Sequence, residues 1–233
     1  MKKLLLVILT VFFTGSSFSQ QEQISFSEAL SLHLPKYKLQ ADKAYRTRNF
    51  ERAEFLFDSL INYSLKGSRL DNFKVKDLRK NSISLDEFQK PVYLTTYASW
   101  IVPTKGEIPA LNKLAEKYSD EVDFVLLFWD NHDTAKALAK KYHKNIKVLY
   151  VDEMQNNSSY VIKMMKHSLG LPTSFLLNKD KEIIDIRRKI SHPYGLELEK
   201  SFDLNFNSFN EAISLLLIKD SSQYSQTKEA LTP

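Results

Sequence analysis

The sequence contains no cysteine in its 233 residues. Thiol–disulfide exchange requires a thiolate that attacks a disulfide sulfur, so this chain cannot form, reduce or rearrange a disulfide with its own side chains. The chain must also be stabilised without a disulfide of its own. Roughly 210 residues beyond a leader can bury enough apolar surface for that.

Other chemistry is limited by composition as well. Glycine occurs five times, and no glycine-rich loop could cradle a phosphate group. The five histidines show no metal-binding spacing, and the one adjacent carboxylate, Asp133 beside His132, is explained by capping of a helix. The formal charge of +5 includes Lys2 and Lys3, and no basic block could follow a phosphate backbone. We therefore expect no metal, no cofactor and no nucleic-acid partner.

The first residues have the three parts of a secretory signal. Lys2–Lys3 is the charged region, Leu4–Phe13 is an apolar core too short to span a bilayer, and Ser17–Ser19 supplies small residues for a peptidase. We expect a signal peptide over 1–19, cleaved after Ser19 or Gln20, and a periplasmic or otherwise extracytoplasmic protein; the alternative is that the segment stays uncleaved as a membrane anchor. No cysteine follows the core, so a lipoprotein anchor is excluded, and no other stretch predicts a membrane span.

Residues 20–65 predict a helical extension. An apolar stripe recurs at three- and four-residue spacing, and Asn49 is a suitable N-cap. The stripe consists of Ala53, Leu56, Phe57, Leu60 and Ile61. The two helical segments resemble one hairpin of the tetratricopeptide kind, but a solenoid needs about three such units. We therefore favour an extension that packs on the main domain.

The central part of the chain predicts an α/β fold. Residues 93–100 form an apolar, β-branched and aromatic run typical of a buried strand, and a helix is expected from about Glu107 to Tyr118. A second apolar run, Val122–Trp129, follows. A strand, a helix and a strand at this spacing predict parallel neighbours joined by a right-handed crossover.

The turn after the first strand resembles the active-site turn of thioredoxin-like proteins of the TlpA/ResA type. That turn reads Trp-Cys-x-Pro-Cys in the family. Here it reads Trp100, Ile101, Val102, Pro103, Thr104. The segments Ser84–Phe88, Lys90–Pro91 and Gly170–Ile184 are similar to the family's "Ser-Leu-x-x-Phe", "Lys-Pro" and "Gly-x-Pro-Thr-x-Phe-Leu-Ile-Asp" segments.

The resemblance implies a thioredoxin-like three-layer fold, in which helices flank a central mixed sheet. It implies a domain over 66–218 that is closed by a last helix, and a cis peptide bond before Pro172. The polar residues 219–233 predict a flexible tail.

Both family cysteines are replaced, by Ile101 and Thr104. The buried acid that assists proton transfer in the family would fall near Thr95, which is not an acid. We therefore expect no catalytic residue and no enzyme activity. An oxidoreductase, which family membership would suggest, is disfavoured by the missing thiols.

The carboxyl ends of the parallel strands predict where a ligand would bind. That edge should carry Trp100, Ile101 and Trp129, with Leu171 and Pro172 closing it. In active relatives this groove holds a substrate polypeptide. We therefore expect noncovalent binding of an envelope polypeptide, as in a chaperone or an adaptor. Two alternatives stay open: the tryptophans fill the edge of the core, or the fold serves as a structural subunit that docks a larger assembly.

Overall fold

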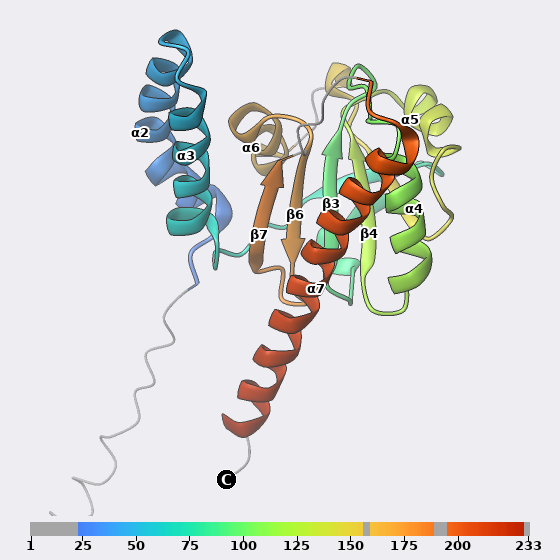
Figure 1. Ribbon diagram of the computed structural model, residues 1–233. Coiled ribbons are helices and arrows are strands. Elements are labelled where there is room, and N and C mark those ends of the chain that lie inside the picture. The colour runs from blue at the N-terminus through green and yellow to red at the C-terminus, as the bar shows by residue number, and fades with distance from the viewer. Residues whose placement is uncertain (1–22, 156–158, 189–194, 231–233) are drawn as a thin grey trace, which may run out of the picture.

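The computed structural model describes residues 23–155, 159–188 and 195–230. The leader predicted over 1–19 lies outside these residues. Within them, strands form one sheet in the order β2-β1-β5-β4-β3-β6-β7 (Figure 1). Their bounds are β1 Lys74–Asp77, β2 Ser82–Ser84, β3 Val92–Tyr97, β4 Asp123–Phe128, β5 Ile146–Tyr150, β6 Thr173–Leu177 and β7 Ile183–Arg188. The β3–β4 and β4–β5 pairs are parallel and the other pairs are antiparallel, so the sheet is mixed.

Helices cover both faces of this sheet, as Figure 1 shows. The helices are α2 Phe26–Arg46, α3 Phe50–Leu60, α4 Glu107–Tyr118, α5 His132–Ala139, α6 Tyr160–Leu169 and α7 Leu198–Ala230, with short turns at η1 Ile61–Leu65, η2 Leu85–Glu87 and η3 Glu153–Gln155. One apolar core contains side chains of α2, α3, η1 and α6, and the second contains side chains of α4, α5 and α7. Two cores on opposite faces of one sheet give the three layers that were predicted, so the fold class is confirmed.

The central strands are buried because helices lie on both sides of them. All residues of β4 after Asp123 are buried, and only Thr95 of β3 is half-buried. The sequence of a strand that is covered on both faces is a continuous apolar run, rather than an alternation of apolar and polar residues. The helix α4 instead buries one stripe, Ala110, Leu111, Leu114 and Ala115, against the sheet.

The N-terminal helices form one hairpin that packs on the β7 side of the sheet. Asn49 is the N-cap of α3 and accepts a hydrogen bond from the backbone N of Arg52 at 2.9 Å, as the sequence predicted. Phe26, at the start of α2, is fully buried, and its ring packs edge-on against that of Phe175 in β6 with centroids 5.8 Å apart. The guanidinium of Arg188 lies 3.5 Å from the ring centroid of Phe57. The hairpin therefore shares its apolar contacts with the main domain.

The last helix is longer than expected. We predicted a flexible tail from residue 219, whereas α7 continues to Ala230. No glycine or proline interrupts residues 198–230, and the carboxylate of Asp220 accepts from the backbone N of Lys179 at 3.2 Å and pairs with its ammonium at 3.1 Å. The helix therefore has both local and tertiary support beyond the point where its apolar stripe ends. No helix in the described parts of the chain is long and apolar enough to cross a membrane.

Candidate functional site: the sulfur-free turn and the cavity beneath it

The turn 98–104 connects β3 to α4 and is held at the end of β4. The backbone N of Ser99 donates to the carboxylate of Asp130 at 2.8 Å, and the Ser99 hydroxyl donates to the same carboxylate. The side chains of Trp100 and Val102 point into solvent, with 68% and 82% of their surface exposed. Large apolar side chains at such exposure, close together on one turn, are a feature of interaction surfaces.

The peptide bond before Pro172 is cis, as the resemblance implied. Thr96 pairs with Thr173 in the β3–β6 ladder, and the Thr96 hydroxyl donates to the carbonyl of Thr173 at 3.0 Å. This register brings Pro172 opposite Tyr97, directly below the turn. Ile101 and Leu171 pack against the same apolar core. The structure therefore places three of the five predicted groove residues, Ile101, Leu171 and Pro172, at one edge of the sheet, and Trp100 precedes Ile101 on the turn.

The fifth predicted groove residue, Trp129, does not belong to the rim. Its side chain is only 6% exposed and lies in the core on the α6 side of the sheet. Its backbone N donates to the carbonyl of Tyr97 at 2.9 Å, so the β3–β4 pairing continues one residue beyond β4. Because side chains of a strand alternate between the two faces of the sheet, this pairing directs the indole of Trp129 into the core. The alternative reading, in which a tryptophan fills the edge of the core, therefore holds for Trp129 and not for Trp100.

Thr104, which replaces the second family cysteine, is held by two helices. Its backbone N donates to the carboxylate of Glu107 at 3.1 Å, and the side-chain amide of Asn205 in α7 donates to its hydroxyl at 3.0 Å. The backbone N of the neighbouring Gly106 donates to the hydroxyl of Ser201 at 3.0 Å. Polar contacts from α4 and α7 thus restrain the turn at the place where a disulfide would restrain it in a dithiol relative.

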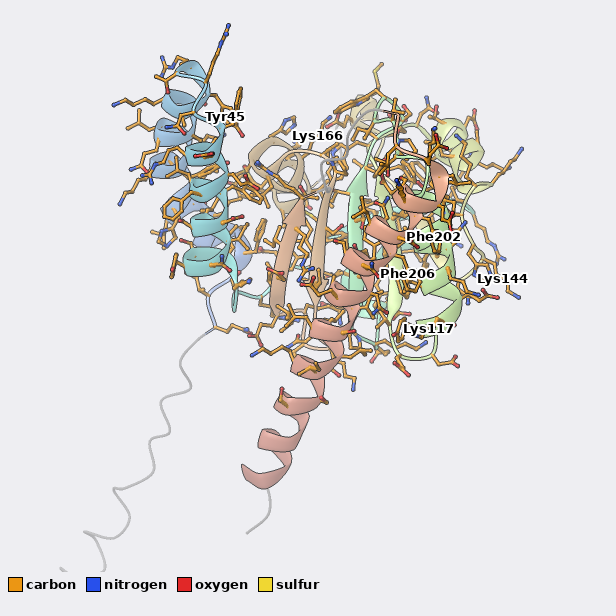
Figure 2. All side chains as sticks on the ribbon, in the orientation of Figure 1. Tyr45, Lys117, Lys144, Lys166, Phe202 and Phe206 are labelled. Carbon is orange, nitrogen blue, oxygen red and sulfur yellow. The ribbon has the colours of Figure 1, made fainter. Side chains whose placement is uncertain are left out.

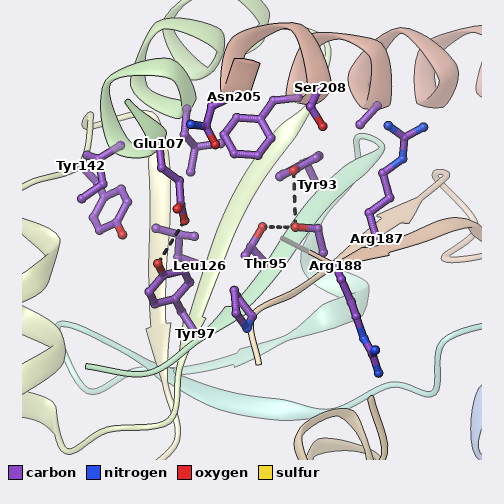
Figure 3. Close-up of a pocket in the computed structure, with 16 residues that line it drawn as sticks. Tyr93, Thr95, Tyr97, Glu107, Leu126, Tyr142, Arg187, Arg188, Asn205 and Ser208 are labelled. Atoms are coloured by element: carbon purple, nitrogen blue, oxygen red, sulfur yellow. Dashed lines mark hydrogen bonds between the residues drawn. The ribbon is translucent and has the colours of Figure 1, made fainter. Parts of the chain in front are cut away.

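A partly enclosed cavity of about 40 Å³ lies beneath this turn, between the sheet, α4 and α7 (Figure 3). Polar side chains on its lining form two groups. At one end the Glu107 carboxylate, 9% exposed, accepts a hydrogen bond from the Tyr97 hydroxyl at 3.0 Å. At the sheet, the Ser174 hydroxyl hydrogen-bonds to the hydroxyls of Thr95 at 2.9 Å and Tyr93 at 3.4 Å. Tyr142, Pro172, Arg187, Asn205 and Ser208 also line the cavity.

Glu107 and Asn205 were not predicted as site residues. Glu107 stands three positions after Thr104, which is the spacing of a capping box, and this signal could have placed its carboxylate at the helix start. Thr95 is not an acid, as expected, but the cavity that it lines contains the Glu107 carboxylate instead. Asn205 carries no local signal, because its position depends on how α7 packs against α4.

The tyrosines at this end of the cavity have displaced pKa values. Burial raises the pKa of Tyr97, and the negative charge of Glu107 raises it further. The same two causes raise the pKa of Tyr142. Both hydroxyls therefore stay protonated near neutral pH and can act only as hydrogen-bonding groups. Within the described residues no set of three or more histidine, aspartate or glutamate side chains could hold a metal ion.

We expect the Glu107→Gln variant to have a lower pKa for Tyr142, which stays above the ordinary value of about 10 because the ring remains buried. NMR titration of a chain labelled with ¹³C at the tyrosine ring measures this directly. In the native chain the stability should fall as the pH rises above about 10, because unfolded tyrosine ionises there and the two folded ones do not. A Tyr142 that titrates identically in both chains would contradict the stated geometry. Glu116→Gln, on the exposed side of α4, is the control.

The fold and the sulfur-free turn define a thioredoxin-like redoxin domain. Residues 67–186 match the AhpC/TSA family, and the chain belongs to this family. The chain is similar to thiol-disulfide oxidoreductase ResA of Bacillus thuringiensis, with 32% identity over 121 residues that cover 51% of this chain and 66% of that protein. It is also similar to thioredoxin-like protein YneN of Bacillus subtilis, with 26% identity over 145 residues, or 60% of this chain and 80% of that protein.

A solved thioredoxin domain of a thiol-disulfide oxidoreductase from Bacteroides vulgatus is 18% identical, with a TM-score of 0.47, and covers 63% of this chain and 96% of that structure. The match to ResA spans just under two thirds of that protein's length. The chain is thus a TlpA/ResA-type thioredoxin-like protein, and it has no cysteine at the positions where the family has its dithiol.

Proposed function

We propose that this protein binds an extended polypeptide without covalent chemistry, in the groove formed by Trp100, Ile101, Leu171 and Pro172. The observation that carries the proposal is the exposure of Trp100 and Val102 on the turn that follows β3, the strand whose end is paired next to the cis-proline. Two large apolar side chains that are exposed close together on one turn form an apolar patch, and such patches mark interaction sites. Here the framework of the turn is kept by specific hydrogen bonds, and its two most exposed residues are apolar.

The chemistry of the groove supports recognition rather than turnover. Ile101 has no nucleophile, and the Thr104 hydroxyl is occupied by Asn205. An extended chain next to Leu171 could add backbone hydrogen bonds, as in other strand-addition complexes, while Trp100 supplies apolar contact area. We further propose that binding takes place outside the cytoplasm, because residues 1–19 have the composition of a secretory signal.

Trp100 is also a built-in reporter of binding. With Trp129 buried, a shift in tryptophan emission on addition of a tryptophan-free polypeptide reports on the exposed Trp100. We expect a thiol-blocked, unfolded polypeptide to shift the emission to shorter wavelength in a saturable manner, and Trp100→Ala to weaken binding at least tenfold in a competition assay, since truncated interface aromatics commonly cost 2 kcal/mol or more.

The matched control is Tyr63→Ala, which removes an aromatic ring that is 86% exposed on the helical hairpin, far from the groove in sequence. If Tyr63→Ala weakens binding as much as Trp100→Ala, the groove is not the binding surface. One outcome would favour the docking-subunit alternative over a chaperone: a single partner binds saturably, with one polypeptide per chain, and unrelated polypeptides do not bind.

A further inference from the structure

The sequence has no long basic block, but the fold brings two basic segments together on the α5 side of the sheet. Residues 134–151 contain five lysines and no aspartate or glutamate, and the turn 78–81 adds two basic side chains. One of the five, Lys147, lies over the ring of Phe88 on the opposite side of the sheet. The others form an exposed basic face, which consists of Arg79, Lys80, Lys136, Lys140, Lys141 and Lys144.

Strand pairing and one side-chain contact hold the two segments next to each other. β1 runs antiparallel to β5, with Asp77 opposite Leu149, so the turn after β1 extends toward the start of β5. The ring Nε2 of His132, the first residue of α5, donates to the carbonyl of Leu78 at 3.1 Å. Lys136 is four residues after His132 and lies on the same side of α5. The basic residues that follow Leu78 therefore lie beside those of α5.

The loop 140–145, which carries three of these lysines, is held in place by α4. The side-chain amide of Asn112 donates to the carbonyl of Lys141 at 3.0 Å, and its oxygen accepts from the backbone N of His143 at 2.7 Å. These bonds engage the backbone of the loop, while the lysine side chains are exposed. Figure 2 shows Lys144 at the periphery of the molecule. The charges are thus presented from a fixed backbone.

The acids near the basic face are fewer than its cations. Asp77 accepts from the backbone N of Arg79 at 2.8 Å, and Asp133 hydrogen-bonds to the ring Nδ1 of His132 at 2.9 Å. The acids of residues 120–123 are at the start of β4, which lies on the other side of β5 from β1. Even with Asp77 and Asp133 counted in full, basic charges outnumber acidic ones by six to two.

Helix stabilisation does not account for the whole basic face. Cations near the carboxyl end of a helix are favoured by its dipole, which explains Lys136 and Lys140 at the end of α5. Arg79 and Lys80 belong to the turn between β1 and β2, where no helix ends. The gathering of both groups on one side therefore points to an anionic partner.

The composition of the basic face indicates the kind of partner. Five of its six side chains are lysines, and lysine is depleted at protein–protein interfaces, where arginine and aromatic rings are enriched. A lysine ammonium is a compact, hydrated charge without the planar fork by which arginine grips a single phosphate or carboxylate. Clustered lysines instead suit a surface of many mobile anions, such as the headgroups of an anionic membrane.

We infer that the basic face binds the surface of an anionic phospholipid bilayer by electrostatic attraction. Loop 140–145 precedes β5, whereas the groove follows β3, and β3, β4 and β5 are parallel. The loop and the groove therefore lie at opposite ends of these strands. A membrane at the loop leaves the groove open, and membrane binding does not require that the groove binds a polypeptide.

The test measures co-sedimentation of the full chain with vesicles of equal parts phosphatidylglycerol and phosphatidylcholine. The buffer contains about 0.1 M NaCl, at which charges act over roughly 10 Å. We expect Lys140→Glu combined with Lys144→Glu to weaken binding at least tenfold, because every basic side chain near an anionic surface adds to the attraction. Arg79→Glu combined with Lys80→Glu, in the other segment, should have the same effect.

The matched control is Lys36→Glu combined with Lys38→Glu, which changes the net charge equally at exposed positions of α2 and should bind as the native chain does. All these chains keep residues 1–19, so any binding through the apolar leader is common to them. Equal binding of the native chain and the basic-face variants would overturn the inference, and so would a control that binds as weakly as they do. The two variants change different segments, so if one fails to fold the other still decides.

Two soluble anions separate a membrane from other sources of negative charge. Sodium phosphate and sodium chloride at equal ionic strength should release the chain from the vesicles equally, because both screen a diffuse attraction to the same extent. Stronger release by phosphate would overturn the inference in favour of a site for a single phosphate group. Lysine-dependent binding of poly-L-glutamate, with no binding of anionic vesicles, would overturn it in favour of an acidic protein partner.

Discussion

Replacing Gly106 with alanine is expected to lower the free energy of unfolding by about 3 kcal/mol or more, among the larger effects of a single methyl group. Gly106 lies where α4 begins, and α7 crosses it at very close range near Phe202, which Figure 2 labels. A Cβ atom at this position would lie 2.1 Å from the backbone N of Phe202 and 2.4 Å from its Cα. These are backbone atoms, so no side chain can turn away to make room.

The substitution should also affect the groove, because α7 would have to move away from α4. The contacts from Ser201 to Gly106 and from Asn205 to Thr104 span this crossing and would be lost. For a chain of this size a loss of about 3 kcal/mol corresponds to a fall in Tm of about 6–12 °C. Thermal unfolding followed by circular dichroism measures this fall, and the Trp100 emission of the folded variant reports on the turn.

Glu116→Ala in the same helix is the control, because its side chain is 60% exposed and makes only a surface pair with Lys113. It should change stability by less than about 0.5 kcal/mol. If Gly106→Ala is as stable as this control, α4 and α7 do not cross at close range, and the contacts from α7 do not restrain the turn.

The sequence predicted the fold where a pattern is local and missed contacts that depend on tertiary placement. The apolar runs of β3 and β4 and the cap at Asn49 were all read correctly, because burial and capping leave a signal in consecutive residues. The cis bond before Pro172 was also predicted, but from family resemblance rather than from the residues themselves.

The candidate site was predicted less completely. Trp129 was placed on the rim because it ends an apolar strand, but whether a strand-end side chain faces inward depends on one further residue of pairing with Tyr97. Asn205 lies 101 positions after Thr104, and nothing in the sequence around it indicates that contact. The continuation of α7 beyond residue 219 was missed because the apolar stripe ends there, while the contact of Asp220 with Lys179 is not local.

Phe26→Ala is expected to lower the free energy of unfolding by about 3–5 kcal/mol, the usual range when a fully buried phenylalanine is truncated. Phe26 has no exposed surface, and it makes an edge-on aromatic pair with Phe175 of β6. Its backbone N also donates to the carbonyl of Arg69 at 2.8 Å, which joins the start of α2 to the segment that precedes the sheet. The expected fall in Tm is about 6–20 °C.

The same substitution at Phe55 separates the effect of burial from that of aromatic content. Phe55 lies on the same hairpin, is 57% exposed and contacts only the guanidinium of Arg52 at 5.1 Å among described ring and cation contacts. Its truncation should cost less than about 1 kcal/mol. The difference between the two variants therefore measures how strongly the hairpin is joined to the main domain.

The number of thermal unfolding transitions shows whether the hairpin unfolds together with the sheet. A hairpin that shares its core with the sheet must unfold together with it, so Phe26→Ala should melt in one transition at a lower temperature. Two transitions, or an unchanged Tm, would mean that α2 and α3 form a separate module whose contacts with β6 and β7 contribute little. In that case the hairpin could bind a partner independently of the main domain. A single transition would instead make the hairpin part of the scaffold that positions β6, Pro172 and the groove.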